Sequence, residues 1–232
     1  MTKPLFREDS YLKECQAIVT AAGEDAIVLD RTVFYPMGGG QPGDGGEISW
    51  DGGTARIVDT RYGDDGEIRH LTEEGAALPA TGSAVTATLD WDRRYLHMRM
   101  HTALHLLGSV LQYGVTGGNI STTKSRLDFD MEDTVDKEQV SSALLALVAA
   151  NHAVSHRWIS DAELEAQPEL VRTMSVQPPK GAGQVRLLEI ENVDLQPCGG
   201  THLKSTGEVG DIRIGKVEKK GKRNRRVSIL LD

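Results

Sequence analysis

Met98-Arg-Met-His-Thr-Ala-Leu-His-Leu-Leu107 is the stretch around which the rest of the chain is organised. Leucine and methionine recur in it at the spacing of a helix that packs one face against a core. The stretch carries His101 and His105, four residues apart. Because a helix turns once every 3.6 residues, both imidazoles lie on one face and can bind the same ion.

A second motif, Pro197-Cys-Gly-Gly-Thr-His202, supplies another pair of potential metal ligands four residues apart. Three histidines and one cysteine suit Zn²⁺, which takes imidazole nitrogen and thiolate sulfur in tetrahedral geometry. Either motif alone is a weak signal, because two histidines on a helix are often only surface or core groups. Together the motifs predict a zinc site formed by His101, His105, Cys198 and His202.

The other histidines of the second half lack such partners. His152 and His156 have the same spacing, but no further cysteine–histidine pair is left to complete a site. We predict a solvated helix end for both. His97 precedes His101 by one turn, and we expect it beside the site or on the surface.

Composition limits the class of protein. The 232 residues are enough for one large domain or two small ones. No apolar run is long enough to span a bilayer, and the first residues lack the apolar core of a signal peptide. Two cysteines are too few for a disulfide scaffold, and a thiolate ligand favours a reducing compartment. We therefore expect a cytoplasmic protein with no membrane partner.

The first part of the chain has the pattern of a small all-β domain. Short β-like runs between residues 11 and 89 are separated by glycine-rich turns, which favours a barrel or a sandwich. The glycine-rich stretch 34–46 is typical of a wide hairpin. It has neither a P-loop lysine nor a following helix pattern, so no nucleotide cofactor is expected.

The remainder mixes helices and strands. Asp90 stands before a helical pattern that runs from Trp91 to about Tyr113, as a capping residue would. A strand near 126–131, a helix over about 137–151 and a turn cluster at 178–183 follow. These patterns predict an α+β fold with two domains, a barrel-like domain at 1–90 and an α/β layered, zinc-binding domain at 91–232.

The segment 216–226 is strongly basic in a chain whose net charge is −8. A run of charges is often only a solvated turn. Its density against an acidic remainder favours contact with phosphates, because RNA binding depends on the local patch and not on the net charge. The candidate phosphate-contacting residues are Lys219, Lys220, Lys222, Arg223, Arg225 and Arg226.

The two histidine motifs resemble those of the editing domain of alanyl-tRNA synthetases and of its free-standing relatives, the AlaX proteins. Residues 30–44, 126–130 and 218–226 agree with that family as well, in the family's order, so the resemblance spans nearly the whole chain. The AlaX form with an N-terminal barrel-like domain is the best match. The resemblance implies an α+β protein in which a small β-barrel domain precedes an α/β two-layer editing domain with a zinc site.

The resemblance also implies an activity. A zinc-dependent aminoacyl-tRNA deacylase of this family would remove serine, with glycine as a further candidate, from mischarged alanine tRNA. The acceptor end of that tRNA would lie near the zinc ion. The ion could activate an associated water, polarise the ester carbonyl, or anchor the amino group of the substrate, so no side chain is assigned as catalytic. Leu104 stands where many synthetase editing domains have a threonine associated with substrate discrimination. The candidate substrate-binding residues are Gly38, Gly39, Gly40, Gln41, Thr102 and Leu104.

Alternatives remain open at this point. Four protein ligands normally form a closed structural site, so either one ligand is weak, with His202 the first candidate, or the shell expands. The alternative function is a non-catalytic, zinc-stabilised tRNA-binding module. A metallopeptidase is disfavoured, because Thr102 holds the place of the general-base glutamate. The glycine-rich stretch and the Cys-Gly-Gly-Thr-His motif favour the alanyl over the threonyl branch. The oligomeric state is not predicted.

Overall fold

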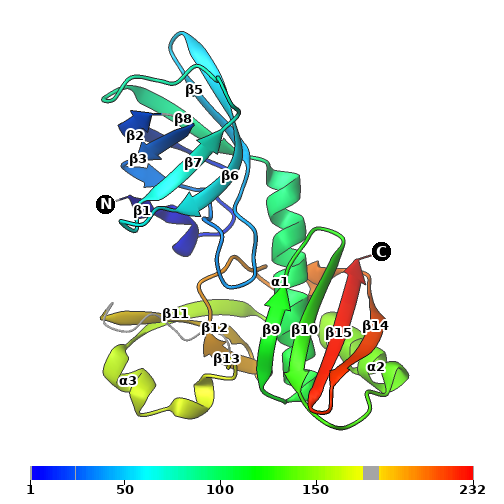
Figure 1. Ribbon diagram of the computed structural model, residues 1–232. Helices are drawn as coiled ribbons and strands as arrows, with labels where there is room; N and C mark the ends of the chain where they lie inside the picture. Colours follow the sequence, from blue (N-terminus) through cyan, green and yellow to red (C-terminus); the bar gives the residue numbers. More distant parts are fainter. Residues whose placement is uncertain (1, 24, 175–182, 232) are drawn as a thin grey trace. The chain divides into compact units, whose positions relative to one another are not determined.

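The computed structural model describes residues 2–23, 25–174 and 183–231. The chain divides into two compact units, Met1–Tyr95 and Leu96–Asp232. The predicted α+β class is confirmed, and it includes a closed barrel of six strands (Figure 1). Of the predicted turn cluster at 178–183, only Gly183 lies within the described residues. Among the helices of the described ranges, none is both long and apolar enough to cross a membrane.

The barrel forms the first unit, and its strands follow the order β2-β3-β7-β6-β5-β8. All neighbouring strands are antiparallel, and alternate side chains such as Val85 and Ala87 of β8 are buried inside. Pairing of β8 with β2 closes the barrel, so no strand edge is left open. A short parallel pair, β1 with β4, lies outside it. The elements are β1 (Lys3–Pro4), η1 (Leu5–Arg7), β2 (Glu14–Gly23), β3 (Ala26–Leu29), β4 (Arg31–Thr32), β5 (Gly46–Trp50), β6 (Gly53–Tyr62), β7 (Ile68–Thr72) and β8 (Ala84–Leu89).

The glycine-rich stretch is a loop between β4 and β5 with one tight turn in it. Gly38 and Gln41 exchange two backbone hydrogen bonds, of 3.1 and 2.9 Å. The two residues between them, Gly39 and Gly40, have φ angles of 55° and 82°, which glycine adopts without strain. The stretch is therefore a folded loop with a turn at its tip, and not the wide hairpin that its composition suggests.

A buried ion pair fastens this loop to the start of α1 (Trp91–Leu111). The Arg94 and Asp44 side chains are 0% and 1% exposed, and the guanidinium Nε lies 3.0 and 3.1 Å from the two carboxylate oxygens. Arg94 also donates to the carbonyl oxygens of Ser10 and Val33. The second partner of Asp44 is the backbone N–H of Tyr35, at 2.6 Å. Both buried charges are thus fully hydrogen-bonded, as burial requires.

His70 is the buried titratable group of the barrel. It is 0% exposed, and its ring nitrogens lie 2.9 Å from the Ile27 carbonyl oxygen and 2.7 Å from the Thr32 hydroxyl. Burial lowers the pKa of His70 to about 4, in spite of the hydrogen bond to Ile27. The imidazole is therefore neutral in the folded protein at neutral pH.

This buried imidazole predicts an acid-dependent loss of stability. The pKa of His70 is about 4 when folded, against 6.5 for an ordinary histidine. The contribution of neutral His70 to the free energy of unfolding is complete above pH 6.5. It is lost as the pH falls toward 4, because the unfolded chain binds the proton at a higher pH than the folded chain does. Between pH 7.5 and pH 4.5 the free energy of unfolding should fall in both proteins. The fall should be about 2–3 kcal/mol smaller in the variant His70→Gln than in the wild type. Urea unfolding at both pH values measures this, and equal losses in the two proteins would contradict it.

The second unit contains two antiparallel sheets (Figure 1). The four-stranded sheet has the order β14-β15-β10-β9, and the three-stranded sheet has the order β11-β12-β13. β15 pairs with β14 on one side and with β10 on the other, although nearly a hundred residues separate β10 from β15. The strands are β9 (Val115–Asn119), β10 (Lys124–Asp130), β11 (Val154–Ser160), β12 (Gln184–Ile190), β13 (Asp194–Pro197), β14 (Ile212–Gly221) and β15 (Asn224–Leu231).

The helices of this unit begin at well-formed caps. The Asp136 carboxylate accepts the N–H groups of Glu138 and Gln139 at the start of α2. Ser160 and Glu163 form a capping box at the start of α3. His156 lies in β11, where it pairs with Leu188 of β12, so the prediction of a helix end is wrong for it. The remaining elements are α2 (Lys137–Ala149), α3 (Asp161–Glu165), η2 (Pro168–Leu170) and η3 (Thr206–Val209).

Candidate metal centre

The second unit brings four potential metal ligands together. One ligand atom from each of His101, His105, Cys198 and His202 lies within 4.8 Å of the others. The Cys198 Sγ lies 3.5 Å from His101 Nε2 and 3.4 Å from His202 Nε2, and the Nε2 atoms of His202 and His105 are 3.2 Å apart. A tetrahedral ion with bonds of about 2.0–2.3 Å separates its ligand atoms by roughly 3.3–3.6 Å. The four residues therefore fit a four-coordinate ion.

Local structure explains how each pair is presented. His101 and His105 lie one turn apart on α1, and their rings stack with centroids 5.2 Å apart. Cys198 follows β13 directly, and the chain then returns through two glycines to His202. The two motifs thus meet between a helix and the end of a sheet strand.

The electrostatics of the cluster suit a cation. Burial alone would raise the pKa of the Cys198 thiol, but the charge of His101 and its hydrogen bond to the sulfur hold that pKa well below its usual range. Burial also holds the pKa of His202 well below 6.5. The cluster therefore offers a thiolate and a neutral imidazole, the protonation states in which these groups bind metals.

An arginine that we did not single out from the sequence holds the cysteine loop in place. Arg186 of β12 is buried and donates from one guanidinium nitrogen to the carbonyl oxygens of Cys198 (3.0 Å) and Gly200 (3.1 Å). Its own carbonyl oxygen accepts the Cys198 N–H at 3.1 Å. The sequence signal was an arginine inside an apolar strand, which must find partners when it is buried.

Asp194 is a second residue that we did not single out from the sequence, and its carboxylate orients the His105 ring. Its carboxylate is 0% exposed and lies 3.2 Å from His105 Nδ1, while Gln196 donates to the same carboxylate oxygen at 2.5 Å. Arg172 is ion-paired with the other oxygen at 3.3 Å. Burial lowers the pKa of His105, but the hydrogen bonds to Asp194 and Cys198 outweigh it and raise that pKa to about 9. The Nδ1–H donated to Asp194 directs Nε2 toward the other three ligands, and the proton on Nε2 must leave when a metal ion binds there.

This arrangement predicts that Asp194→Asn weakens metal binding. An asparagine of the same shape lacks the negative charge that fixes the His105 tautomer, and loss of such a partner typically lowers metal affinity by about 10- to 100-fold. Competition of the purified protein with a coloured chelator measures the affinity. Asp128→Asn is the control, because that carboxylate pairs with Arg126 and Arg226 instead. An unchanged affinity in the Asp194 variant would contradict the assignment.

The predicted substrate-binding residues are distributed over both units. Thr102 is 0% exposed, and its hydroxyl oxygen accepts the Leu203 N–H at 3.2 Å, which ties α1 to the loop after His202. Leu104 is 4% exposed and belongs to the core. Residues 38–41 form the turn of the first unit, with Gln41 buried. Their role in substrate binding stays a prediction.

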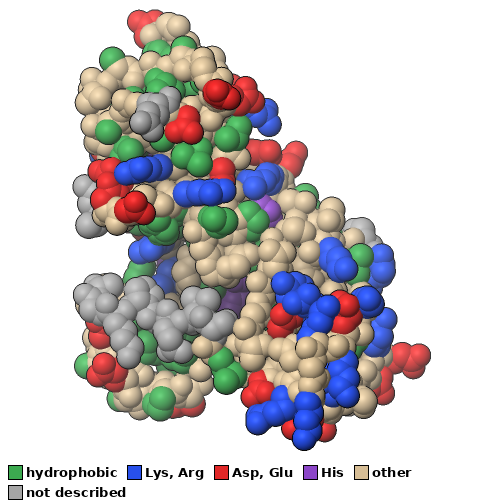
Figure 2. All heavy atoms as spheres, in the orientation of Figure 1, with side chains coloured by type: hydrophobic (Ala, Val, Ile, Leu, Met, Phe, Trp, Pro, Cys, Tyr) green, Lys and Arg blue, Asp and Glu red, His purple; other side chains and the backbone are tan. Residues whose placement is uncertain are grey.

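Lys and Arg side chains gather over the four-stranded sheet (Figure 2). Two of the candidates have structural partners: Arg225 is buried and donates to the carbonyl oxygens of Glu132 and Asp133, and Arg226 forms a two-pronged pair with Asp128 at 2.7 and 2.9 Å. The other four are exposed, namely Lys219, Lys220, Lys222 and Arg223. Of these, Lys220 is paired with Glu218 at 3.2 Å and Arg223 with Asp130 at 3.1 Å. Because exposed ion pairs contribute little, we infer that these four side chains can turn toward a phosphate more easily than Arg225 and Arg226.

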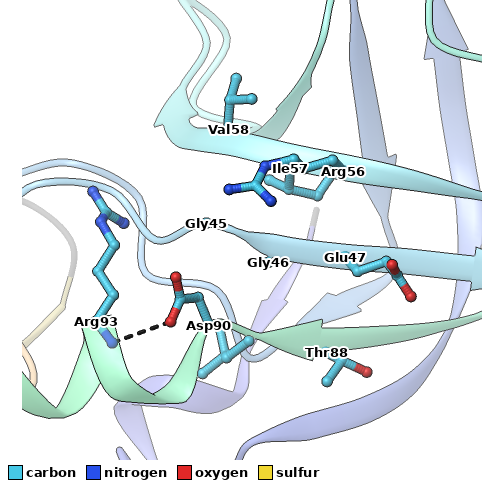
Figure 3. Close-up of a pocket in the computed structure, with 10 residues that line it drawn as sticks. Gly45, Gly46, Glu47, Arg56, Ile57, Val58, Thr88, Asp90 and Arg93 are labelled. Atoms are coloured by element: carbon cyan, nitrogen blue, oxygen red, sulfur yellow. Dashed lines mark hydrogen bonds between the residues drawn. The ribbon is translucent and has the colours of Figure 1, made fainter.

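A pocket of about 690 Å³ lies on the barrel unit, and none of its lining residues belongs to the candidate metal centre (Figure 3). Its lining residues all fall between Gly45 and Arg93. Arg93 donates its backbone N–H to the Asp90 carboxylate at 3.1 Å, so the rim is formed in part by the capped start of α1. The sequence did not predict this pocket.

Two protein families match parts of this chain. Residues 185–228 match the second additional domain of threonyl and alanyl tRNA synthetases, and residues 6–93 match the class II (A) tRNA synthetases. These matches place the chain among proteins that share modules with the threonyl- and alanyl-tRNA synthetases.

Full-length relatives make the assignment more specific. The alanyl-tRNA editing protein AlaX-M of Methanosarcina mazei is 39% identical, and the match covers 98% of this chain and 95% of that protein. AlaX-M of Pyrococcus horikoshii is 32% identical over 100% of this chain and 99% of the relative. The alanine–tRNA ligase of Pyrobaculum aerophilum is 36% identical, over 94% of this chain but only 25% of that protein. The chain belongs to the AlaX family of alanyl-tRNA editing proteins, which confirms the resemblance found in its motifs.

Proposed function

We propose that this protein is an aminoacyl-tRNA deacylase that hydrolyses the ester of serine, and of glycine as a further substrate, on mischarged alanine tRNA. The observation that carries the proposal is the convergence of the two histidines of α1 with Cys198 and His202, in a chain related over its whole length to alanyl-tRNA editing proteins. In this proposal residues 91–232 are the tRNA-editing domain, arranged as two layers, and residues 1–90 are the barrel domain.

The metal in this proposal is Zn²⁺. A set of three imidazole nitrogens and one thiolate in tetrahedral spacing is the donor set that zinc prefers. Bound there, the ion would supply Lewis acidity to the ester reaction. The protein's own part is to hold the set rigid: Asp194 orients His105, and Arg186 fixes the backbone of the cysteine loop. The thiolate requires a reducing environment, so we further propose that the protein works in the cytoplasm.

The distances around His202 are similar to those around the other ligands. Its Nε2 lies 3.4 Å from Cys198 Sγ and 3.2 Å from His105 Nε2, within the range seen across the cluster. These contacts do not distinguish His202 from the other ligands. Both versions of the proposal are therefore kept: His202 as a weak ligand, or a coordination shell that would expand when substrate binds.

A hydrolytic site that binds the serine hydroxyl would spare tRNA that is correctly charged with alanine. A pocket sized for a methyl group cannot decisively exclude serine or glycine, so a separate hydrolytic site corrects the error. A site that hydrogen-bonds the serine hydroxyl leaves polar groups without partners when alanine enters, which spares the correct product. Leu104 has no hydrogen-bonding group, so another residue must recognise that hydroxyl.

The partner is the acceptor end of alanine tRNA, and the exposed basic residues of the β14–β15 hairpin are its proposed phosphate contacts. Lys219 and Lys222 lie at the end of β14 and in the turn after it. Changing them to alanine together should weaken tRNA binding and reduce its salt dependence.

Deacylation of serine-charged alanine tRNA by the zinc-loaded protein, beside the alanine-charged tRNA, tests the proposal. We expect rapid loss of serine with alanine retained. Tight tRNA binding with neither ester cleaved would instead support the non-catalytic zinc-stabilised binding module. Cleavage of both esters would leave a hydrolase whose selectivity is not the proposed one.

A further inference from the structure

One face of the three-stranded sheet carries the residues that form and support the metal centre. Directly opposed residues of antiparallel strands point to the same face, and alternate residues along a strand do so as well. Ile190 opposes Asp194, and Leu188 opposes Gln196. Cys198 comes two residues after Gln196, and its N–H bonds to the Arg186 carbonyl. Asp194, Gln196 and Cys198 therefore share one face.

An exposed tryptophan lies on that same face. Trp158 of β11 is directly opposite Arg186 of β12, and the Arg186 guanidinium binds the Cys198 carbonyl on the far side. The three residues thus form a row across the sheet, with Trp158 two strand spacings, or about 10 Å, from the cysteine. Figure 1 shows β11, β12 and β13 as neighbours in this order.

Trp158 differs from the rest of the row in its exposure. Its side chain is 43% exposed, whereas Arg186 beside it is 6% exposed. An indole is a large flat apolar surface that is normally covered in a folded domain. A flat exposed ring beside a buried metal centre is suited to a flat ligand that reaches that centre.

We propose that Trp158 is the stacking platform for the base of the terminal nucleotide whose aminoacyl ester enters the metal centre. This rests on the proposed function. The ester is attached to the ribose, so the base lies one sugar ring away from the reacting carbonyl, on the scale of the distance between Trp158 and Cys198. Stacking on an aromatic ring contributes binding without reading the base, which suits a nucleotide placed by its ester.

Substrate kinetics test the platform. Base stacking on an aromatic side chain is worth about 1–3 kcal/mol, which corresponds to about a 5- to 150-fold loss of affinity on removal. Trp158→Ala should raise the tRNA concentration at half-maximal deacylation by that factor, with the metal content unchanged. Trp158→Phe, which keeps a flat ring, should restore most of the affinity. Equal half-saturation in wild type and Trp158→Ala, in an active enzyme, would overturn the proposal.

Fluorescence separates this inference from the proposed activity. The chain has three tryptophans, and the double variant Trp50→Phe/Trp91→Phe leaves Trp158 as the only one. Uncharged alanine tRNA should quench its emission, because a stacked base quenches an indole, even if no ester is hydrolysed. Quenching that depends on protein concentration without tRNA would indicate self-association through this face and would overturn the proposal. If the wild type hydrolyses no ester but tRNA still quenches Trp158, the proposed deacylase activity is contradicted and base stacking on Trp158 is supported.

Discussion

Replacing Cys198 with serine is expected to abolish metal-dependent stabilisation of the protein. The Cys198 thiol has a pKa well below its usual range beside His101 and His202, so it provides the only negative charge among the four ligands. A serine hydroxyl keeps its proton at neutral pH and cannot replace that charge. Because structural zinc sites contribute about 10–16 kcal/mol in total, loss of one ligand should weaken binding at least about a hundredfold.

The measurement is the melting temperature with and without Zn²⁺, together with chelator competition. A ligand that binds only the folded chain raises its stability according to its concentration relative to Kd, so wild type should melt higher with zinc and Cys198→Ser should not. Cys15→Ser is the matched control: it changes the other free cysteine, which lies in β2 of the barrel. Burial raises the pKa of that thiol, and its removal should leave metal binding unchanged. Zinc stabilisation of the Cys198 variant equal to that of wild type would rule out the quartet as the metal site.

Arg94→Ala is expected to lower the free energy of unfolding by about 3–5 kcal/mol, because it leaves the Asp44 carboxylate buried without its counter-ion. Both side chains are essentially inaccessible to water, and Arg94 also satisfies two backbone carbonyls of the barrel unit. Removal of the guanidinium therefore leaves three acceptors without their donor. The loop that contains the glycine-rich turn should loosen together with the start of α1.

Urea unfolding followed by circular dichroism measures the loss. Arg61→Ala is the control, because Arg61 pairs with Asp59 at 2.7 Å with its own side chain 55% exposed. Exposed pairs contribute only about 0–1 kcal/mol, so this variant should stay close to wild type. The double variant Arg94→Met/Asp44→Leu should recover part of the stability, since it removes both buried charges. If Arg94→Ala and Arg61→Ala lower the free energy of unfolding by similar amounts, the buried ion pair contributes no more to stability than the exposed one.

The sequence alone was enough to predict the features that depend on local periodicity and on residue chemistry. The 3.6-residue repeat of α1 placed His101 and His105 on one face, and the second motif supplied a cysteine and a histidine of matching chemistry. Alternating strands and glycine-rich turns indicated the barrel in the first ninety residues. These signals are local, because neighbours within one turn or one strand determine them.

Only the tertiary structure decided which distant residues meet. Nothing near Asp194 or Arg186 in the chain indicates that the first binds His105 and the second binds the cysteine loop, since both contacts depend on the pairing of β12 with β13 and on the packing of α1. Arg225 illustrates the converse: its basic neighbours suggested phosphate binding, yet the fold buries it against backbone carbonyls. Long-range pairing brings together groups that no local pattern connects. The four residues that cluster as candidate metal ligands were therefore predictable from the sequence, whereas the residues that contact them were not.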